Sequence, residues 1–239
     1  MEEDYTLAHT SLTIVQKTTG NNSPENAWMR EIVPGLFIGN VASSYNMWLL
    51  QRNNIQAIVS LTSKYRPLWD SRTMVAGIAA RNHLWVNVDD VVGADLLSAM
   101  KDICDFIDSV APPQLDSLSA LPAASQAQGV NGGQVSNSQC SEPLPAVLVH
   151  CTCGVSRSST AIAAYLMRKL QLERDDVLQF IRSKQPYIQP NRGFRLQLQL
   201  WYYSGYQGRA NRGKILMVHS TPIFDLARNL TDGLVSLPF

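Results

Sequence analysis

Strands and helices are predicted to alternate along the middle of the chain. Short runs rich in apolar and β-branched residues have the length of buried strands; they are 55–61, 84–88 and 146–149. Other stretches repeat an apolar residue every three or four positions, as one face of a helix does; they are 96–107, 159–170, 177–181 and 194–201. Residues 63–82 are predicted to form a loop and a short helix. This order predicts an α/β fold, a short and mostly parallel sheet flanked by helices.

Three segments depart from this pattern. Residues 1–27 are mostly polar and are predicted to form a flexible N-terminal arm. Residues 111–145 hold only two charged residues and no aromatic residue, so we expect a low-complexity insertion that cannot pack. It is an inert spacer or, alternatively, a docking or regulatory segment. Residues 207–239 form a C-terminal extension to which no motif assigns a role. The folded domain is predicted to span 28–206.

One motif lies between a predicted buried strand and a predicted helix, and it carries candidate chemistry. It reads His150-Cys151-Thr152-Cys153-Gly154-Val155-Ser156-Arg157-Ser158. A tight loop in that context surrounds one anion with backbone N–H groups and a positive helix end. The same groups favour the thiolate of Cys151, and Arg157 can hold two phosphate oxygens with its planar fork. The motif predicts a phosphate-binding loop with a nucleophile at its base.

These residues resemble the HCxxGxxRS signature of cysteine-dependent protein phosphatases, and within them the dual-specificity branch. Further segments are similar to other parts of that family; they are 32–40, 55–62 and 190–198. The resemblance implies that 28–206 is a dual-specificity phosphatase catalytic domain with its phosphate loop between the central strand and a helix. It also implies hydrolysis of phosphotyrosine and phosphoserine/phosphothreonine in proteins through a phosphocysteine intermediate, with no cofactor and no metal.

The motif assigns a role to each candidate residue. Cys151 is the predicted nucleophile and Arg157 the predicted phosphate ligand. Ser158 is expected to donate a hydroxyl hydrogen bond to the thiolate, or simply to cap the helix. His150 is expected to brace the loop from the other face of its strand, and Asn191 is a structural residue that caps the last helix. The residues predicted to bind the substrate phosphate are Thr152, Cys153, Gly154, Val155, Ser156 and Arg157.

A phosphatase of this kind also needs an acid that protonates the leaving oxygen. The resemblance implies an aspartate just after the strand 84–88, and it aligns Asp90 with that acid. Asp89 and Asp95 are the alternatives in the same loop. Each of the three could also be an ordinary solvated carboxylate.

Other functions are also compatible with the sequence. A pseudophosphatase that only binds phosphoproteins is one, although such relatives usually lack the cysteine or the arginine. RNA and lipid phosphatases of the same superfamily are others, but the uncharged variable positions of the loop disfavour a phosphoinositide. A zinc site could be built from Cys140, His150, Cys151 and Cys153, although the paired spacing typical of such sites is missing.

Charge and cysteine content restrict the partners. The formal net charge is +1, which indicates neither a nucleic-acid-binding nor a membrane-binding surface. The four cysteines do not form a disulfide framework, and no apolar run approaches membrane-spanning length. We therefore expect phosphorylated protein substrates and a cytoplasmic or nuclear location, where a thiolate survives. The oligomeric state stays open.

Overall fold

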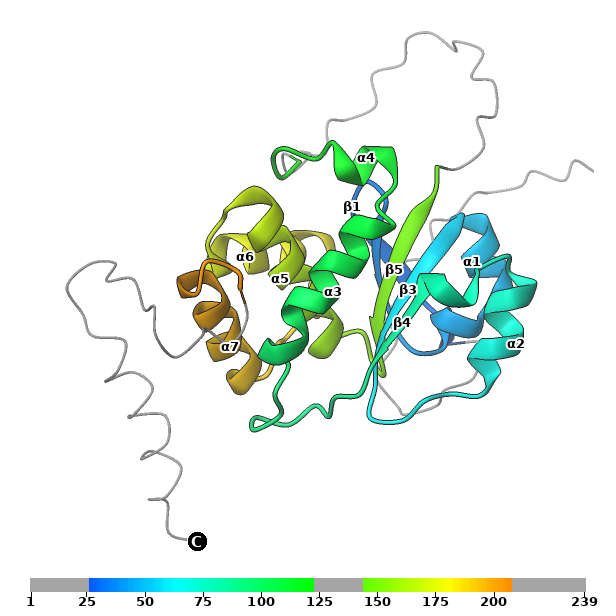
Figure 1. The fold of residues 1–239 in the computed structure, drawn as a ribbon, viewed down its shortest axis with the longest axis horizontal. Helices are drawn as coiled ribbons and strands as arrows, with labels where there is room; N and C mark the ends of the chain where they lie inside the picture. Colours follow the sequence, from blue (N-terminus) through cyan, green and yellow to red (C-terminus); the bar gives the residue numbers. More distant parts are fainter. Residues whose placement is uncertain (1–25, 123–143, 208–239) are drawn as a thin grey trace, which may run out of the picture.

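A five-stranded sheet is the centre of the protein (Figure 1). The computed structural model describes residues 26–122 and 144–207. The strands are β1 (Met29–Val33), β2 (Leu36–Gly39), β3 (Ile55–Leu61), β4 (His83–Val86) and β5 (Ala146–Cys151). Their order is β1-β2-β5-β3-β4, and every neighbouring pair is parallel except the antiparallel pair of β1 and β2. This confirms the predicted α/β fold and the central position of the strand that precedes the motif.

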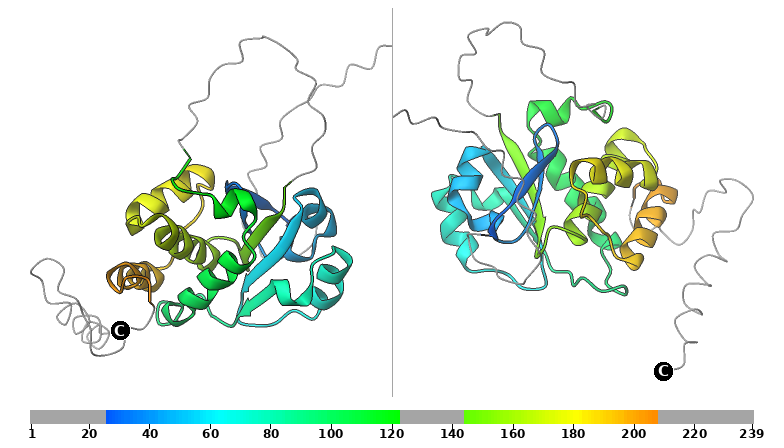
Figure 2. Two further views of the ribbon diagram at one scale, coloured as in Figure 1. Left: turned by 45° about the horizontal axis from the view of Figure 1, so that its top comes forward. Right: turned by 180° about the vertical axis from the view of Figure 1, so that it is seen from behind.

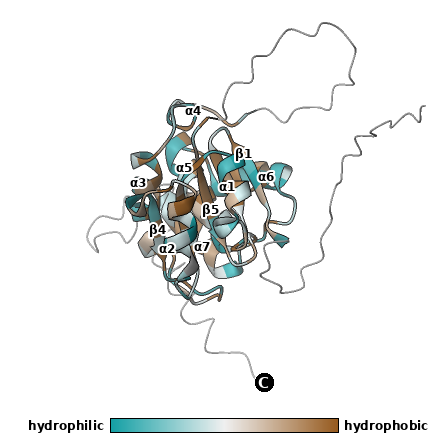
Figure 3. Cartoon of the chain, turned by 90° about the vertical axis from the view of Figure 1, so that its right-hand side faces the viewer, coloured by the Kyte–Doolittle hydropathy of each residue, from teal (hydrophilic) through white to brown (hydrophobic). Residues whose placement is uncertain are grey.

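Helices cover both faces of the sheet (Figures 1 and 2). On one side lie α1 (Met47–Arg52) and α2 (Leu68–Val75); on the other lie α3 (Leu97–Ser109), α5 (Arg157–Leu170), α6 (Arg174–Lys184) and α7 (Arg192–Tyr203). Two short 3₁₀ turns, Ser43–Tyr45 and Ala80–Asn82, complete the first side. In Figure 3 the ribbon around β5 is hydrophobic, whereas the outer turns of α6 are hydrophilic. The strand that carries the motif therefore runs through the interior.

The alternation of side chains along β5 divides the interior into two cores. Val147, Val149 and Cys151 belong to the larger core, which α5 and its neighbouring helices cover. Ala146 and Leu148 belong to the smaller core on the α1 side. Because successive side chains of a strand point to opposite faces, Cys151 and its neighbour His150 are separated by the sheet.

The insertion begins later than the composition suggests. Residues 111–122 are described, and they include the short helix α4 (Pro113–Asp116). Leu115 is fully buried in the larger core, and Leu118 and Leu121 pack against that core. The prediction that 111–145 cannot pack is therefore wrong for 111–122, because a leucine at every third position provides an apolar edge and Pro113 suits the first turn of a helix. Residues 1–25, 123–143 and 208–239 lie outside the described residues, so the predictions for the arm, the rest of the insertion and the extension are not tested.

Leu115→Ala is expected to lower the free energy of unfolding by about 2–5 kcal/mol, because it leaves a cavity in the core. Leu144→Ala is the matched control from the same predicted insertion, since Leu144 is 64% exposed. That control should change stability by less than about 0.5 kcal/mol. Urea unfolding followed by circular dichroism measures both variants. Equal stability of the two would mean that α4 does not support the core.

Candidate active site

Gly154 allows the motif to turn tightly between β5 and α5. Its φ of +71° lies in the left-handed region, where glycine is favoured over residues with a side chain. A Cβ at this position would lie 2.5 Å from the ring of Trp28 and 2.7 Å from the carbonyl oxygen of Gly39. Backbone strain and lack of space therefore both require glycine here.

Cys151 ends β5 with its thiol buried beneath the loop. Its Sγ accepts a hydrogen bond from the Gly154 amide at 3.2 Å and another from the Ser158 hydroxyl at 3.3 Å. Donors of this kind stabilise a thiolate. Ser158 lies inside the first turn of α5, whose N-cap is Ser156, so the alternative that Ser158 merely caps the helix is wrong.

The loop backbone presents donors rather than acceptors to the space above the thiol. The carbonyl of Thr152 accepts from the Val41 amide, and the carbonyl of Val155 accepts from the Gln189 amide. The amides of Cys153, Val155 and Ser156 donate to no other described residue. Successive unpaired amides in one turn form an anion-binding concavity.

Arg157 is held rigidly beside this concavity. Its Nη1 donates to the carbonyl of Val88 at 3.1 Å and its Nη2 to Oγ1 of Thr152 at 3.0 Å. Nε is buried and has no hydrogen-bond partner among the described residues, and it lies 3.7 Å from Oδ2 of Asp90. A buried charged donor that makes no hydrogen bond has capacity left to bind an anion beside the loop.

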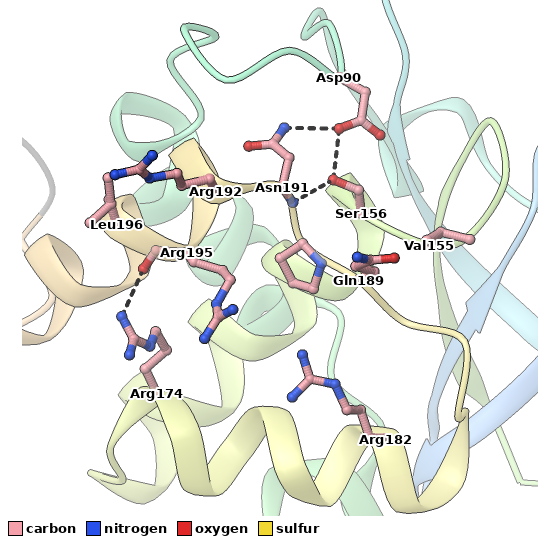
Figure 4. A pocket seen from close by; sticks show the side chains of 11 residues that line it. Asp90, Val155, Ser156, Arg174, Arg182, Gln189, Asn191, Arg192, Arg195 and Leu196 are labelled. Atoms are coloured by element: carbon pink, nitrogen blue, oxygen red, sulfur yellow. Dashed lines mark hydrogen bonds between the residues drawn. The ribbon is translucent and has the colours of Figure 1, made fainter. Parts of the chain in front are cut away.

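Asp90 is joined to the loop and to the start of α7 (Figure 4). Its Oδ1 accepts from the Ser156 hydroxyl at 2.7 Å and from Nδ2 of Asn191 at 2.9 Å. The Asn191 amide in turn donates to the Ser156 hydroxyl, and the Asn191 side chain caps α7 by accepting from the Phe194 amide. The structure thus brings together Asp90, Ser156 and Asn191, to which the sequence assigned the separate roles of acid, phosphate-binding residue and helix cap.

The segment that follows Asp90 is fixed to α7 by contacts that the sequence did not reveal. Oε1 of Gln197 accepts from the amides of Leu96 and Leu97, and its Nε2 donates to the carbonyl of Ala94. The sequence did contain a signal for these contacts, because Gln197 lies in the segment 190–198 that resembles the family. The only role predicted within that segment was the helix cap by Asn191.

Close backbone packing joins the same two parts a second time. A Cβ on Gly193 would lie 1.9 Å from the carbonyl oxygen of Val92, so only glycine lets the loop after Asp90 lie against α7.

The two alternative acids are placed differently from Asp90. Asp89 is exposed and makes no ion pair or side-chain hydrogen bond with any described residue. Asp95 accepts from the amide and the hydroxyl of Ser98 and so stabilises the start of α3. The geometry therefore favours Asp90.

His150 braces the motif from the opposite face of the sheet. It is fully buried; its Nδ1 lies 3.3 Å from the carbonyl oxygen of Cys151 and its Nε2 2.6 Å from the Ser60 hydroxyl. That hydroxyl also contacts Nε2 of His83 at 2.8 Å, and Trp69 packs edge-on against both imidazoles. Because a carbonyl only accepts, Nδ1 of His150 donates, Ser60 donates to its Nε2, and His83 donates to Ser60. Burial lowers the pKa of His150 to about 3 and that of His83 to about 4, so both are neutral at physiological pH.

Neither a metal cluster nor a membrane span is found in 26–122 or 144–207. No group of three histidine, cysteine or carboxylate side chains there could hold an ion. Cys140, one member of the alternative zinc set, lies outside these residues. No helix in the same ranges is long and apolar enough to cross a bilayer.

Comparisons with known proteins agree with this geometry. The dual specificity phosphatase catalytic domain family matches residues 138–204. Dual specificity protein phosphatase 22-A of Danio rerio is 28% identical over 171 residues, covering 72% of this chain and 64% of that protein. Dual specificity protein phosphatase 15 of Rattus norvegicus is 28% identical over 179 residues, covering 75% and 59%. These matches support membership in the dual-specificity phosphatase family.

Solved structures of the family share the fold. A crystal structure of DUSP15 superposes with a TM-score of 0.55 at 26% identity, covering 75% of this chain and 90% of the other. The Yvh1 phosphatase domain from Chaetomium thermophilum gives 0.56 at 23% identity, covering 77% and 100%, which shows the fold alone. The matches span only 64% and 59% of the two curated relatives described above, so their full-length activities and partners are not transferred.

The neutral histidine pair predicts loss of stability in mild acid. In the unfolded chain a histidine takes up a proton near pH 6.5, whereas folded His150 and His83 do so only near pH 3 and 4. The free energy of unfolding should therefore fall as the pH drops below 6.5, by up to about 1.4 kcal/mol per pH unit for each histidine.

Urea unfolding at pH 7, 6.5, 6, 5.5 and 5 measures this dependence. His83→Gln removes one of the two groups, so its slope below pH 6.5 should be clearly smaller than that of the wild type. Identical slopes would show that His83 is not kept neutral by burial.

Proposed function

We propose that this chain is a protein phosphatase that hydrolyses phosphotyrosine and phosphoserine/phosphothreonine through a phosphocysteine intermediate. The observation that carries the proposal is the buried Cys151 thiol, which receives two hydrogen bonds at the base of a loop with unpaired amides. The guanidinium of Arg157, whose Nε makes no hydrogen bond and forms an ion pair of 3.7 Å with Asp90, adds a positive charge beside the same space. Membership in the dual-specificity phosphatase family supports the reaction type.

In the first step the Cys151 thiolate attacks the phosphorus of the bound phosphate. The sulfur–phosphorus bond forms while the bond from phosphorus to the substrate oxygen breaks. The loop amides and Arg157 stabilise the charge on the phosphoryl oxygens. Asp90 in its protonated form gives its proton to the leaving oxygen, which departs as a tyrosine, serine or threonine hydroxyl.

In the second step water attacks the phosphocysteine. The Asp90 carboxylate now takes a proton from the water, the new oxygen–phosphorus bond forms, and the sulfur–phosphorus bond breaks. The Ser158 hydroxyl stabilises the thiolate that leaves, since it already donates to Sγ. The products are inorganic phosphate and the regenerated enzyme.

The two cysteines of the loop differ in their suitability as nucleophiles. Cys153 is exposed on the loop, and partial burial together with the neighbouring Cys151 raises the pKa of its thiol. The thiol of Cys153 therefore stays protonated near neutral pH, and no described group donates a hydrogen bond to its sulfur. Cys104, Cys151 and Cys153 are all free thiols, which fits the proposed cytoplasmic or nuclear location.

Cys151→Ser should lower kcat/KM for a small aryl phosphate by at least about a thousandfold, because a serine hydroxyl stays protonated where a thiolate is needed. Cys153→Ser is the matched control, two positions away in the same loop, and should keep most of the activity. Turnover is measured without added metal, before and after thiol alkylation. Comparable activity of Cys151→Ser and wild type would refute the proposed mechanism.

Asp90→Asn should lower kcat/KM for a phosphopeptide by about 10²- to 10³-fold, because the leaving hydroxyl then departs without a proton. The loss should be far smaller with an aryl phosphate whose leaving group is already acidic. Asp89→Asn is the neighbouring control and should behave as wild type with both substrates. If Asp89→Asn shows the selective defect instead, the assignment of the acid is wrong.

A further inference from the structure

A hollow of about 250 Å³ opens on the side of the sheet that α1 and α2 cover (Figure 1). Helix α2, the segments on either side of it and the first residue of β4 line this hollow. Its lining residues all lie between Tyr65 and His83, apart from the phosphate loop, the loop that carries Asp90 and α7. Pockets for drug-sized ligands measure about 300–1,000 Å³, so a hollow of this volume suits a single side chain.

A chain of hydrogen bonds fixes which ring nitrogen of His83 carries the proton. The carbonyl of Cys151 only accepts, so Nδ1 of His150 donates to it and Nε2 of His150 accepts from the Ser60 hydroxyl. The Ser60 oxygen in turn accepts from Nε2 of His83. Nδ1 of His83 is therefore the unprotonated nitrogen of a neutral ring, and it makes no hydrogen bond with any described residue. Since His83 lines the hollow, this nitrogen is available there as an acceptor.

The other polar side chains of the hollow already donate their protons. The Tyr65 hydroxyl donates to the Asp70 carboxylate, and the Thr73 hydroxyl donates to the carbonyl of Trp69. Asp70 makes no ion pair with any residue that the structure describes. Burial lowers the pKa of His83, and the charge of Asp70 opposes that effect. The side chains that line the hollow thus offer lone pairs and one negative charge, but no free N–H or O–H group.

Three arginines are near the hollow in sequence, but none of them lines it. Arg72 donates to Sδ of Met47 at 3.6 Å and so faces α1. Burial raises the pKa of Tyr45 and the charge of Arg66 opposes this effect, so Arg66 lies near the 3₁₀ turn that precedes α1. Arg81 is exposed on the 3₁₀ turn before β4. The carboxylate in the hollow therefore has no cation beside it among the lining residues.

Exposed apolar side chains surround the mouth of the hollow. Met74 is 70% exposed and Tyr65 is 40% exposed, and both line it. Trp85 packs edge-on against Tyr65 and is also exposed, as is Val75 on α2. Clustered apolar groups of this kind indicate a surface that contacts another protein. A side chain that enters the hollow from a partner protein brings neighbouring residues that cover them.

We propose that this hollow binds an arginine side chain of a partner protein. A guanidinium is planar, is always charged and carries N–H donors but no acceptor, so it matches the Asp70 carboxylate and Nδ1 of His83 together. Its plane can stack on the ring of Tyr65, and its alkyl stem can pack against Met74 and Ile78. The inference does not rest on the proposed phosphatase function, because it concerns a separate site and its test measures binding.

Peptides that differ in one side chain test this inference on the full chain. All carry the same apolar flanking residues, and the central residue is arginine, lysine or citrulline. Citrulline has nearly the shape of arginine but is neutral, so the arginine peptide should bind about tenfold more tightly than the citrulline peptide, or by about 1.4 kcal/mol. The lysine peptide should fall between them, because an ammonium donates from a single point. Calorimetry measures the affinities, and the ¹⁵N NMR signal of Nδ1 of His83 should shift when that nitrogen accepts a hydrogen bond.

Two variants locate the site. Asp70→Asn removes the negative charge and should abolish the tenfold preference for arginine over citrulline. Ala80→Phe fills the space from an exposed lining position and should abolish binding of the arginine peptide. Asp102→Asn is the matched control, because Asp102 is an exposed carboxylate on α3, on the other side of the sheet, and this variant should keep the preference.

Three outcomes would overturn the proposal. Equal affinity for the arginine and citrulline peptides, or a preference that survives in Asp70→Asn, would show that the hollow does not recognise the charge. An unchanged signal of His83 in the complex with the arginine peptide would place that peptide elsewhere on the protein. Free agmatine, a small amine that carries the same guanidinium, is the third probe; if it binds as tightly as the arginine peptide, the site is one for small amines and not for a partner protein.

Discussion

The two hydrogen bonds that converge on Sγ of Cys151 are the constraint on which the rest of the structure depends. One donor is the amide of Gly154, and the other is the hydroxyl of Ser158 in the first turn of α5. Both reach the sulfur only if the strand ends at Cys151, the loop turns at Gly154, and the helix begins at Arg157. Three features of the fold therefore place these two donors on the sulfur of Cys151. They are the central position of β5, the positive φ of Gly154 and the buried start of α5.

The opposite face of the sheet supports this geometry without adding charge. His150 is fixed by Ser60 and by the carbonyl of Cys151, and burial keeps it neutral together with His83. A protonated imidazole beneath the loop would add a second positive charge close to the thiol and the phosphate. With a neutral brace, the charge of a bound anion is met by Arg157 and by the loop amides alone. His150 therefore fixes the position of the loop without contributing charge. The positive charge that meets the anion comes from the other face of the sheet, where Arg157 and the loop amides lie.

Local patterns predicted the elements and the motif, whereas contacts between distant side chains could not be predicted. Apolar runs and periodicity identified β3, β5 and the helices α3, α5, α6 and α7, which all cover one face of the sheet, and the spacing of the motif identified Cys151 and Arg157. The hydrogen bonds from Ser156 and Asn191 to Asp90 join residues 66 and 101 positions apart, and the contacts of Gln197 with the start of α3 are as remote in the chain. Only folding brings such groups together. Helix α4 was missed for a different reason, because the composition of 111–145 as a whole concealed the buried Leu115.

Helix α7 positions the proposed acid. Asn191 caps the helix and holds Asp90, and Gln197 fixes the segment that follows Asp90. The carbonyl of Val92 lies so close to Gly193 that the loop after Asp90 packs directly on the first turn of α7. Because one helix holds both ends of the loop that carries Asp90, the distance from the acid to Cys151 depends on where α7 packs.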